Sequence, residues 1–137
     1  MPDDVNVLTE QIIGCANGVF GHLGPGLPQN AHEEAICTEL RNAGIRYRRQ
    51  VPVPITYREE ALGEYRIDML LEDRVVVEIE SIEQMAQVHE AELLTYLTAN
   101  GKKAGLPINF DSQFLRDGIQ EFVLESADFS VCSHAHA

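Results

Sequence analysis

Three carboxylates, Asp68, Glu78 and Glu80, lie in one short stretch of the chain, YRIDMLLEDRVVVEIE, which covers residues 65–80. The second half of this stretch is apolar on both faces apart from its glutamates, which predicts a buried, central strand. A carboxylate on such a strand is costly unless it binds a cation, shares a proton or meets a positive partner. The stretch is therefore the first candidate for a site of acid–base chemistry.

The length of the turn inside this stretch decides whether the acids meet. With a two-residue turn at 72–73, Asp68 faces Val77 and points away from Glu78. With a three-residue turn at 72–74, Asp68 stands opposite Glu78, and such loops are common in hairpins. Glu78 and Glu80 are two residues apart and so share one side of the sheet. We predict the three-residue turn, because it alone brings the three carboxylates together.

A helix predicted over 84–100 carries a second row of polar side chains. His89, Glu92 and Tyr96 follow i, i+3, i+7 spacing and therefore share one face. If that face lies over the hairpin, Glu92 joins the carboxylates. His32, on an earlier helix, could also face the sheet.

The remaining pattern predicts a single domain, 1–137, of the α/β (α+β) class, with a mixed five-strand sheet flanked by helices. The helix at 30–43 has Asn30 as its expected N-cap and Glu33 as the capping-box partner. The chain is expected to turn at 59–63, and the tail from about 126 is expected to be loose. The predicted helices and strands are 6–23, 30–43, 45–57 (an edge strand, because it holds two prolines), 64–71, 75–80, 84–100, 104–110 and 119–124.

The charge balance limits the partners. Ten Lys and Arg residues against 22 Asp and Glu residues give a formal net charge of −12. Nucleic-acid binding draws most of its affinity from neutralised phosphates, so a nucleic-acid partner is disfavoured, and the cluster Arg46, Arg48 and Arg49 is interpreted as a solvated strand edge. No membrane-length apolar run or signal-peptide pattern is present, and the three cysteines are far apart. We expect a cytoplasmic protein whose edge strand permits a homodimer.

In this order and spacing, several segments resemble one known family. They are GHLGPGL, EEAICTEL, RRQVPVPITY, YRIDMLLEDRVVVEIE, HEAELLTYL and INF. The chain resembles the GxxExxY proteins, a small bacterial group within the PD-(D/E)XK nuclease superfamily, over almost its whole length. The resemblance implies a nuclease-like core with an acidic site for Mg²⁺ or Mn²⁺, in which Asp68 and Glu78 are the metal ligands.

Four polar positions depart from the family pattern. Gln29 stands where the GxxExxY motif has its glutamate, and His32 stands at its tyrosine. Glu80 replaces the lysine of the ExK motif, and Glu92 replaces a glutamine on the later helix. The site has therefore lost a lysine and gained two glutamates. Each of these changes makes the site less favourable to a negatively charged phosphodiester.

Three hypotheses follow from these residues. The first is a site repurposed for acid–base catalysis, with or without a metal, on a small molecule that is not a nucleic acid; clustered carboxylates suit this role because they drive one another's pKa values apart. The second is a nuclease that uses ExE in place of ExK, and the third is an inert binding module. In the first hypothesis the candidate catalytic residues are Asp68, Glu78, Glu80, Glu92 and His32, and the candidate substrate-binding residues are Gln29, His89 and Tyr96.

Overall fold

The computed structural model describes residues 5–80, 93–98, 101, 104–110, 114–124 and 131–135. For Gln29, Glu80, 123–124 and 131–135 it describes the backbone alone.

Two helices begin the chain, α1 (Val5–Leu23) and α2 (Gln29–Ala43), and each buries one apolar stripe. Helix α2 ends at Gly44, whose left-handed backbone (φ 75°) closes it as the sequence predicts. The predicted capping box at its start is wrong. Pro28 is the N-cap residue and no side chain caps the helix, because the helix begins two residues earlier than an N-cap at Asn30 would allow.

A six-stranded mixed sheet follows, with its strands in sequence order. Only β3 and β4 are parallel among the five neighbouring pairs, and β1 lies at an edge as predicted. The five predicted strands are present, and residues 131–135 of the expected loose tail instead form a sixth, which pairs with β5. The strands are β1 (Tyr47–Tyr57), β2 (Glu60–Leu71), β3 (Val75–Glu80), β4 (Ala104–Asn109), β5 (Gln120–Leu124) and β6 (Val131–Ala135).

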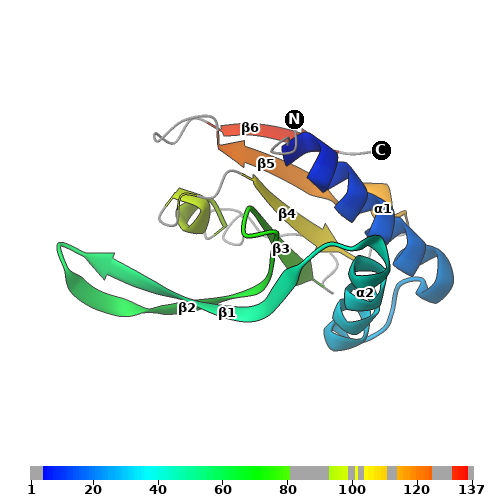
Figure 1. Cartoon of the computed structure of the whole chain (residues 1–137), viewed down its shortest axis with the longest axis horizontal. Helices are drawn as coiled ribbons and strands as arrows, with labels where there is room; N and C mark the ends of the chain where they lie inside the picture. Colours follow the sequence, from blue (N-terminus) through cyan, green and yellow to red (C-terminus); the bar gives the residue numbers. More distant parts are fainter. Residues whose placement is uncertain are drawn as a thin grey trace.

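The hairpin of β1 and β2 extends far beyond the rest of the sheet (Figure 1). Only residues 69–71 of β2 pair with β3, so 51–67 form a two-stranded arm. The predicted turn at 59–63 is too long. Arg58 and Glu59 alone turn the chain, because both have left-handed backbone (φ 48° and 69°) and two such residues complete a tight hairpin.

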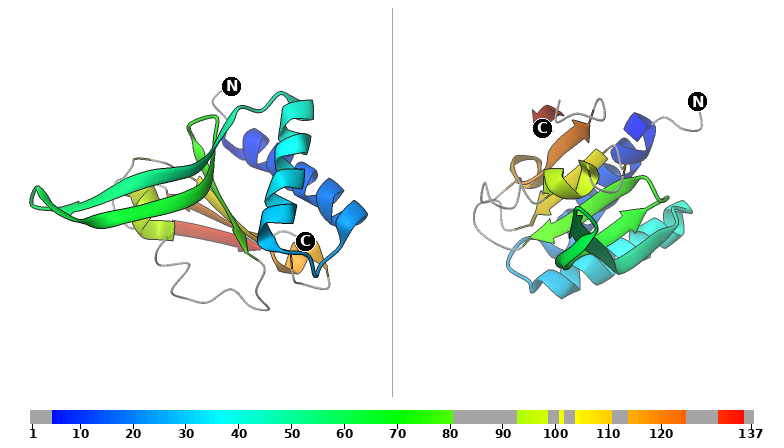
Figure 2. Two further views of the ribbon diagram at one scale, coloured as in Figure 1. Left: turned by 90° about the horizontal axis from the view of Figure 1, so that it is seen from below. Right: turned by 90° about the vertical axis from the view of Figure 1, so that its left-hand side faces the viewer.

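The sheet buries apolar side chains on both faces. Helices α1 and α2 lie side by side against one face (Figures 1 and 2) and share a core with Met69, Leu71 and Val77. A short helical segment, 93–98, packs with a second cluster that includes Leu70 and Val76. The remainder of the predicted third helix lies outside the described residues. Within the described part of the chain, no helix is long and apolar enough to cross a membrane.

Candidate functional site

Asp68 and Glu78 lie at a fork in the sheet, where β2 leaves β3. Leu71 pairs with Val75, so the turn has three residues and the register is the one that the sequence predicts. The ladder ends at Met69, and the next position on each strand is an acid. The two carboxylates are therefore placed where neither strand has its ordinary backbone partner.

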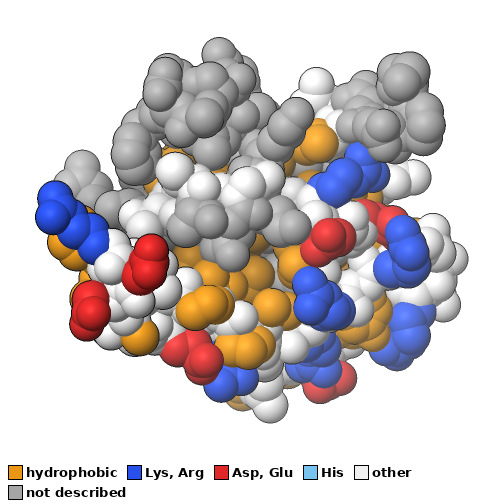
Figure 3. All heavy atoms as spheres, turned by 60° about the vertical axis from the view of Figure 1, so that its left-hand side comes forward, with side chains coloured by type: hydrophobic (Ala, Val, Ile, Leu, Met, Phe, Trp, Pro, Cys, Tyr) orange, Lys and Arg blue, Asp and Glu red, His pale blue; other side chains and the backbone are white. Residues whose placement is uncertain are grey.

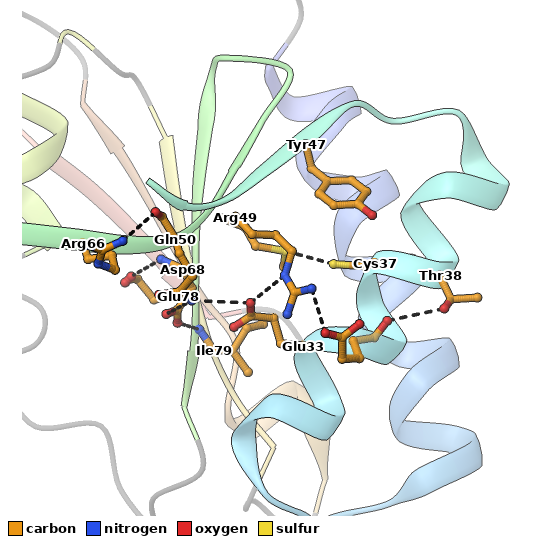
Figure 4. Close-up of polar contacts among 12 residues, drawn as sticks. Glu33, Cys37, Thr38, Tyr47, Arg49, Gln50, Arg66, Asp68, Glu78 and Ile79 are labelled. Atoms are coloured by element: carbon orange, nitrogen blue, oxygen red, sulfur yellow. Dashed lines mark hydrogen bonds and ion pairs between the residues drawn. The ribbon is translucent and has the colours of Figure 1, made fainter. Parts of the chain in front are cut away.

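Each of the two acidic side chains accepts a hydrogen bond from a backbone N–H on the other side of this fork (Figure 4). The backbone N–H of Ile79 donates to Asp68 Oδ2 at 2.7 Å, and the backbone N–H of Asp68 donates to Glu78 Oε1 at 3.3 Å. Each carboxylate thus takes over a backbone donor that the diverging strands leave behind. This exchange satisfies the buried amides and fixes both side chains at the fork.

The pKa of Asp68 is raised above its usual value. Burial is the largest cause, since it disfavours the charged form, and the negative charge of Glu33 acts in the same direction. The N–H of Ile79 and the amide of Gln50 oppose the rise. Asp68 therefore holds a proton to higher pH than an exposed aspartate does.

Glu33 is the functional candidate that sequence reasoning missed. It lies on α2 and is buried, with only 4% of its surface exposed. Arg49 Nε donates to Glu33 Oε2 at 2.9 Å, and a second guanidinium nitrogen of Arg49 donates to Glu34 at 2.8 Å. The signal was present in the helical spacing, because Glu33 precedes the buried Ile36 and Leu40 by three and seven residues. We call Glu33, Asp68 and Glu78 the carboxylate site.

Gln50 connects Glu33 to Asp68. Its side-chain nitrogen lies 3.5 Å from Glu33 Oε2 and 3.5 Å from Asp68 Oδ1, and both contacts are long for hydrogen bonds. Its backbone has φ 52°, an uncommon value for a residue other than glycine. Sequence reasoning also missed this residue, because a glutamine between arginine and valine carries no chemical signal of its own.

His32 is fully buried. Its ring stacks on Phe110 with centroids 4.3 Å apart, and its Nε2–H donates to the carbonyl of Gly24 at 2.9 Å. These contacts tie α2 to the loop that precedes it and to the end of β4. These contacts hold His32 in the fold, and its catalytic role remains a prediction.

Tyr96 and the other predicted site residues are not joined to Asp68 and Glu78 by any described contact. Tyr96 is buried in the second cluster and meets the Tyr65 ring edge-on, with centroids 3.6 Å apart. The backbone of Glu80 pairs with Asn109 at the end of β3. Gln29 opens α2, and its side chain, like that of Glu80, lies outside the description. His89 and Glu92 fall outside the described residues.

A cavity of about 250 Å³ lies between the base of the arm and segment 93–98. Its floor is apolar and its rim carries an ion pair, Arg48–Asp73, at 3.4 Å. None of the carboxylate site lines it. The lining residues are Arg48, Val51, Pro52, Val53, Ile67, Leu70, Asp73, Val76 and Tyr96.

The cluster Arg46, Arg48 and Arg49, at the start of β1, is paired with acids. Arg46 pairs with Glu72 at 2.9 Å, Arg48 pairs with Asp73, and Arg49 pairs with Glu33 and Glu34. Figure 3 shows orange side chains at the centre of one face, with blue side chains gathered on the right and red ones among them. Because each arginine of the cluster is paired with an acid, the positive charge that it can offer to a phosphate backbone is reduced.

The donor chemistry of the fork fits a hard cation. Mg²⁺ and Mn²⁺ bind oxygen ligands, and Asp68 and Glu78 offer carboxylates held at one point by backbone bonds. Within the described residues, no three His, Cys, Asp or Glu side chains are arranged to surround an ion. The described part of the fork thus supplies two ligands.

The sequence profile of one family matches most of the chain. This profile, described as the PD-(D/E)XK nuclease superfamily, covers residues 6–122, from the second residue of α1 to the middle of β5. Comparison with curated proteins gives no match, and comparison with solved structures gives none either. The matched region contains the whole carboxylate site.

Proposed function

Since the chain belongs to the PD-(D/E)XK nuclease superfamily, we propose that its carboxylate site performs acid–base catalysis on a small substrate that is not a nucleic acid. The observation that carries this proposal is the apposition of Asp68 and Glu78 at the fork, where each accepts a backbone N–H of the other strand. Such pairing orients two carboxylates toward one reacting group without using a third side chain.

The surroundings of Asp68 differ from those of an exposed aspartate. The pKa of Asp68 is raised, first by burial and then by the charge of Glu33. Two carboxylates in unlike environments can hold one proton between them, so that one donates a proton and the other accepts one. In this assignment Asp68 is the general acid and Glu78 is the general base.

Charge favours a small substrate over a nucleic acid. The chain has a formal net charge of −12, and Arg46, Arg48 and Arg49 are paired with Glu72, Asp73, Glu33 and Glu34. A long phosphodiester chain would approach an acidic surface without the cations that normally neutralise it. A small neutral or cationic molecule meets no such repulsion.

A divalent cation is compatible with this role. Asp68 and Glu78 would hold Mg²⁺ or Mn²⁺, which would lower the pKa of a bound water. The residues of the chain would keep their own tasks, since the N–H of Ile79 orients Asp68 and the N–H of Asp68 orients Glu78. We further infer that the chain is a GxxExxY-type member whose pocket changed through Gln29, His32, Glu80 and Glu92.

The proposal is tested with chromogenic small esters, amides and phosphoesters, each with and without Mn²⁺. Turnover is expected from the native chain, and it should fall about 100-fold or more in Asp68→Asn and in Glu78→Gln. Asp73→Asn, an exposed acid in the adjacent turn, is the matched control and should retain full turnover. Turnover that survives in Asp68→Asn would remove the fork from the reaction.

A metal titration gives a second, independent measurement. We expect Mg²⁺ or Mn²⁺ to raise the melting temperature of the native chain and of Asp73→Asn, and to leave Asp68→Asn unchanged. Equal shifts in all three proteins would place the bound ion elsewhere.

The second candidate function is a nuclease of the ExE type. Its specific support is that β3 carries Glu78 and Glu80 two residues apart, with Asp68 across the fork from Glu78, in a chain of the PD-(D/E)XK nuclease superfamily. Incubation with plasmid and single-stranded DNA plus Mn²⁺ decides between the two functions. Cleavage that disappears in Asp68→Asn supports the nuclease, and intact DNA together with small-substrate turnover supports the first proposal.

A further inference from the structure

The odd-numbered side chains of β1 lie on one face of the strand before Gln50 and on the opposite face after it. Tyr47 packs with the core of α1 and α2, whereas Val51 and Val53 pack with the second cluster. These residues are all odd-numbered, so a regular strand would place them on one face. The reversal therefore occurs between Tyr47 and Val51, and Gln50 is the residue there with left-handed backbone, at φ 52°.

Strand β2 reverses at the facing position. Met69 and Leu71 belong to the core of α1 and α2, whereas Ile67 and Tyr65 pack with the second cluster. The register pairs Arg49 with Met69 and Val51 with Ile67, which leaves Gln50 and Asp68 as the two intervening residues. Both strands thus change face at one level, and Asp68 is the β2 residue at that level.

The reversal places two consecutive side chains of β1 beside α2. Arg49 and Gln50 both reach Glu33, at 2.9 Å and 3.5 Å, whereas strict alternation would direct one of them to the opposite face. Arg66 donates to the carbonyl of Gln50 at 3.2 Å and holds the turned peptide (Figure 4). The amide of Gln50 is thereby directed to both Glu33 and Asp68.

This arrangement has an energetic cost that glycine would avoid. A side chain on a left-handed residue is crowded by its own backbone, by about 1–2 kcal/mol. Backbone strain of this kind gathers at functional sites, where surrounding structure maintains it. The chain keeps a glutamine at this position, together with its amide, at the level of the carboxylate site.

We propose that Gln50 is the positioning residue of the carboxylate site: its left-handed backbone redirects the arm, and its amide holds the carboxyl of Asp68 beside Glu33. The proposal rests on the proposed function for its purpose, because it says which residue prepares the general acid. The side-chain nitrogen of Gln50 lies 3.5 Å from Asp68 Oδ1 and 3.5 Å from Glu33 Oε2, so it stands between the two carboxyl groups.

Two variants separate the backbone role from the amide role. Gln50→Gly and Gln50→Ala both remove the amide, but only glycine adopts φ 52° without steric cost. The position of the Asp68 carboxyl is followed through the backbone N–H of Ile79, which donates to it at 2.7 Å, by the proton NMR chemical shift of that N–H. We expect the Ile79 N–H signal to move by a similar amount in both variants, because both lose the amide, and Gln50→Gly to melt about 2–6 °C above Gln50→Ala.

An Ile79 N–H signal in Gln50→Gly that is unchanged from the native chain would overturn the proposal. A Gln50→Ala protein that melts as high as Gln50→Gly would overturn the backbone part of it. The NMR measurement uses neither substrate nor metal, so its result does not depend on the proposed function. A shifted Ile79 signal in a chain that turns over no substrate would retain the positioning role and reject the catalytic one.

Discussion

The backbone N–H of Ile79 donates a 2.7 Å hydrogen bond to the carboxylate of Asp68, across the point at which β2 and β3 separate. A side chain here replaces the backbone acceptor that a continuing strand would supply. The same bond that orients the acid also satisfies a buried amide of the central strand. This contact therefore serves both the proposed catalytic role of Asp68 and the stability of the sheet.

Asp68→Asn is expected to abolish turnover without lowering stability. Asparagine keeps an oxygen to accept the N–H of Ile79, and it removes a charge that burial and Glu33 disfavour. A raised pKa in the folded chain means that Asp68 contributes most to stability below the usual aspartate pKa of about 4. This contribution is lost as the pH rises through the folded value. The melting temperature of Asp68→Asn, relative to that of the native chain, should therefore increase as the pH rises from about 4 to neutrality. A relative melting temperature that decreases over this range would contradict the argument that burial disfavours the charge of Asp68.

Arg49→Gln is expected to destabilise the fold by about 1–3 kcal/mol in a urea titration. The change leaves the buried carboxylate of Glu33 without its guanidinium partner, although Arg49 itself is one-third exposed and its contribution is partly screened. Arg49→Gln combined with Glu33→Gln should recover most of the loss, because the second change removes the unpaired charge. If the double variant loses as much free energy of unfolding as the two single variants together, the ion pair between Arg49 and Glu33 is not the cause of the destabilisation.

Glu72→Gln should lower stability at neutral pH by less than about 1 kcal/mol. Arg46 donates to Glu72 from its side chain and from its backbone, and these bonds lower the pKa of Glu72. The stabilisation is present above the usual glutamate pKa of about 4.3 and is lost as the pH falls through the folded value. Melting curves of native and variant chains should therefore converge in acid.

Glu59→Gln is the matched control for Glu72→Gln. Glu59 also has left-handed backbone in a hairpin turn, and no ion pair joins it to the described residues. Its melting temperature should follow the native one at every pH. A loss equal to that of Glu72→Gln would show that the backbone conformation, and not Arg46, sets the effect.

Gly105→Ala should destabilise the chain by about 1–3 kcal/mol. A Cβ on this residue of β4 would lie 3.0–3.2 Å from three atoms of the Leu93 side chain, so that side chain would have to move by a few tenths of an ångström. Gly14→Ala on α1 is the control, since the described atoms leave open space there and alanine favours a helix. Thermal denaturation of both variants checks the contrast, and equal melting temperatures would argue against the packing of Leu93 on β4.

The fork could be predicted because short-range chemistry determines it. The apolar run 75–79 identifies a central strand, and the choice of a three-residue turn follows from requiring the acids to meet. The pairing of Leu71 with Val75 confirms that choice. The length of the two-stranded arm could not be predicted from the sequence. Its turn uses Arg58 and Glu59 in left-handed conformations, and neither residue is a usual marker of such a turn.

The carboxylate site shows where sequence reasoning ends. The sequence by itself determined that Asp68 and Glu78 oppose each other, because register and alternation are local properties of two neighbouring strands. Only the tertiary structure decided that Glu33 and Gln50 join them. Glu33 comes from a helix whose placement depends on the whole core, and Gln50 faces that helix because both strands of the arm change face at one level. Contacts between separate elements follow from packing, which no single segment of the chain encodes.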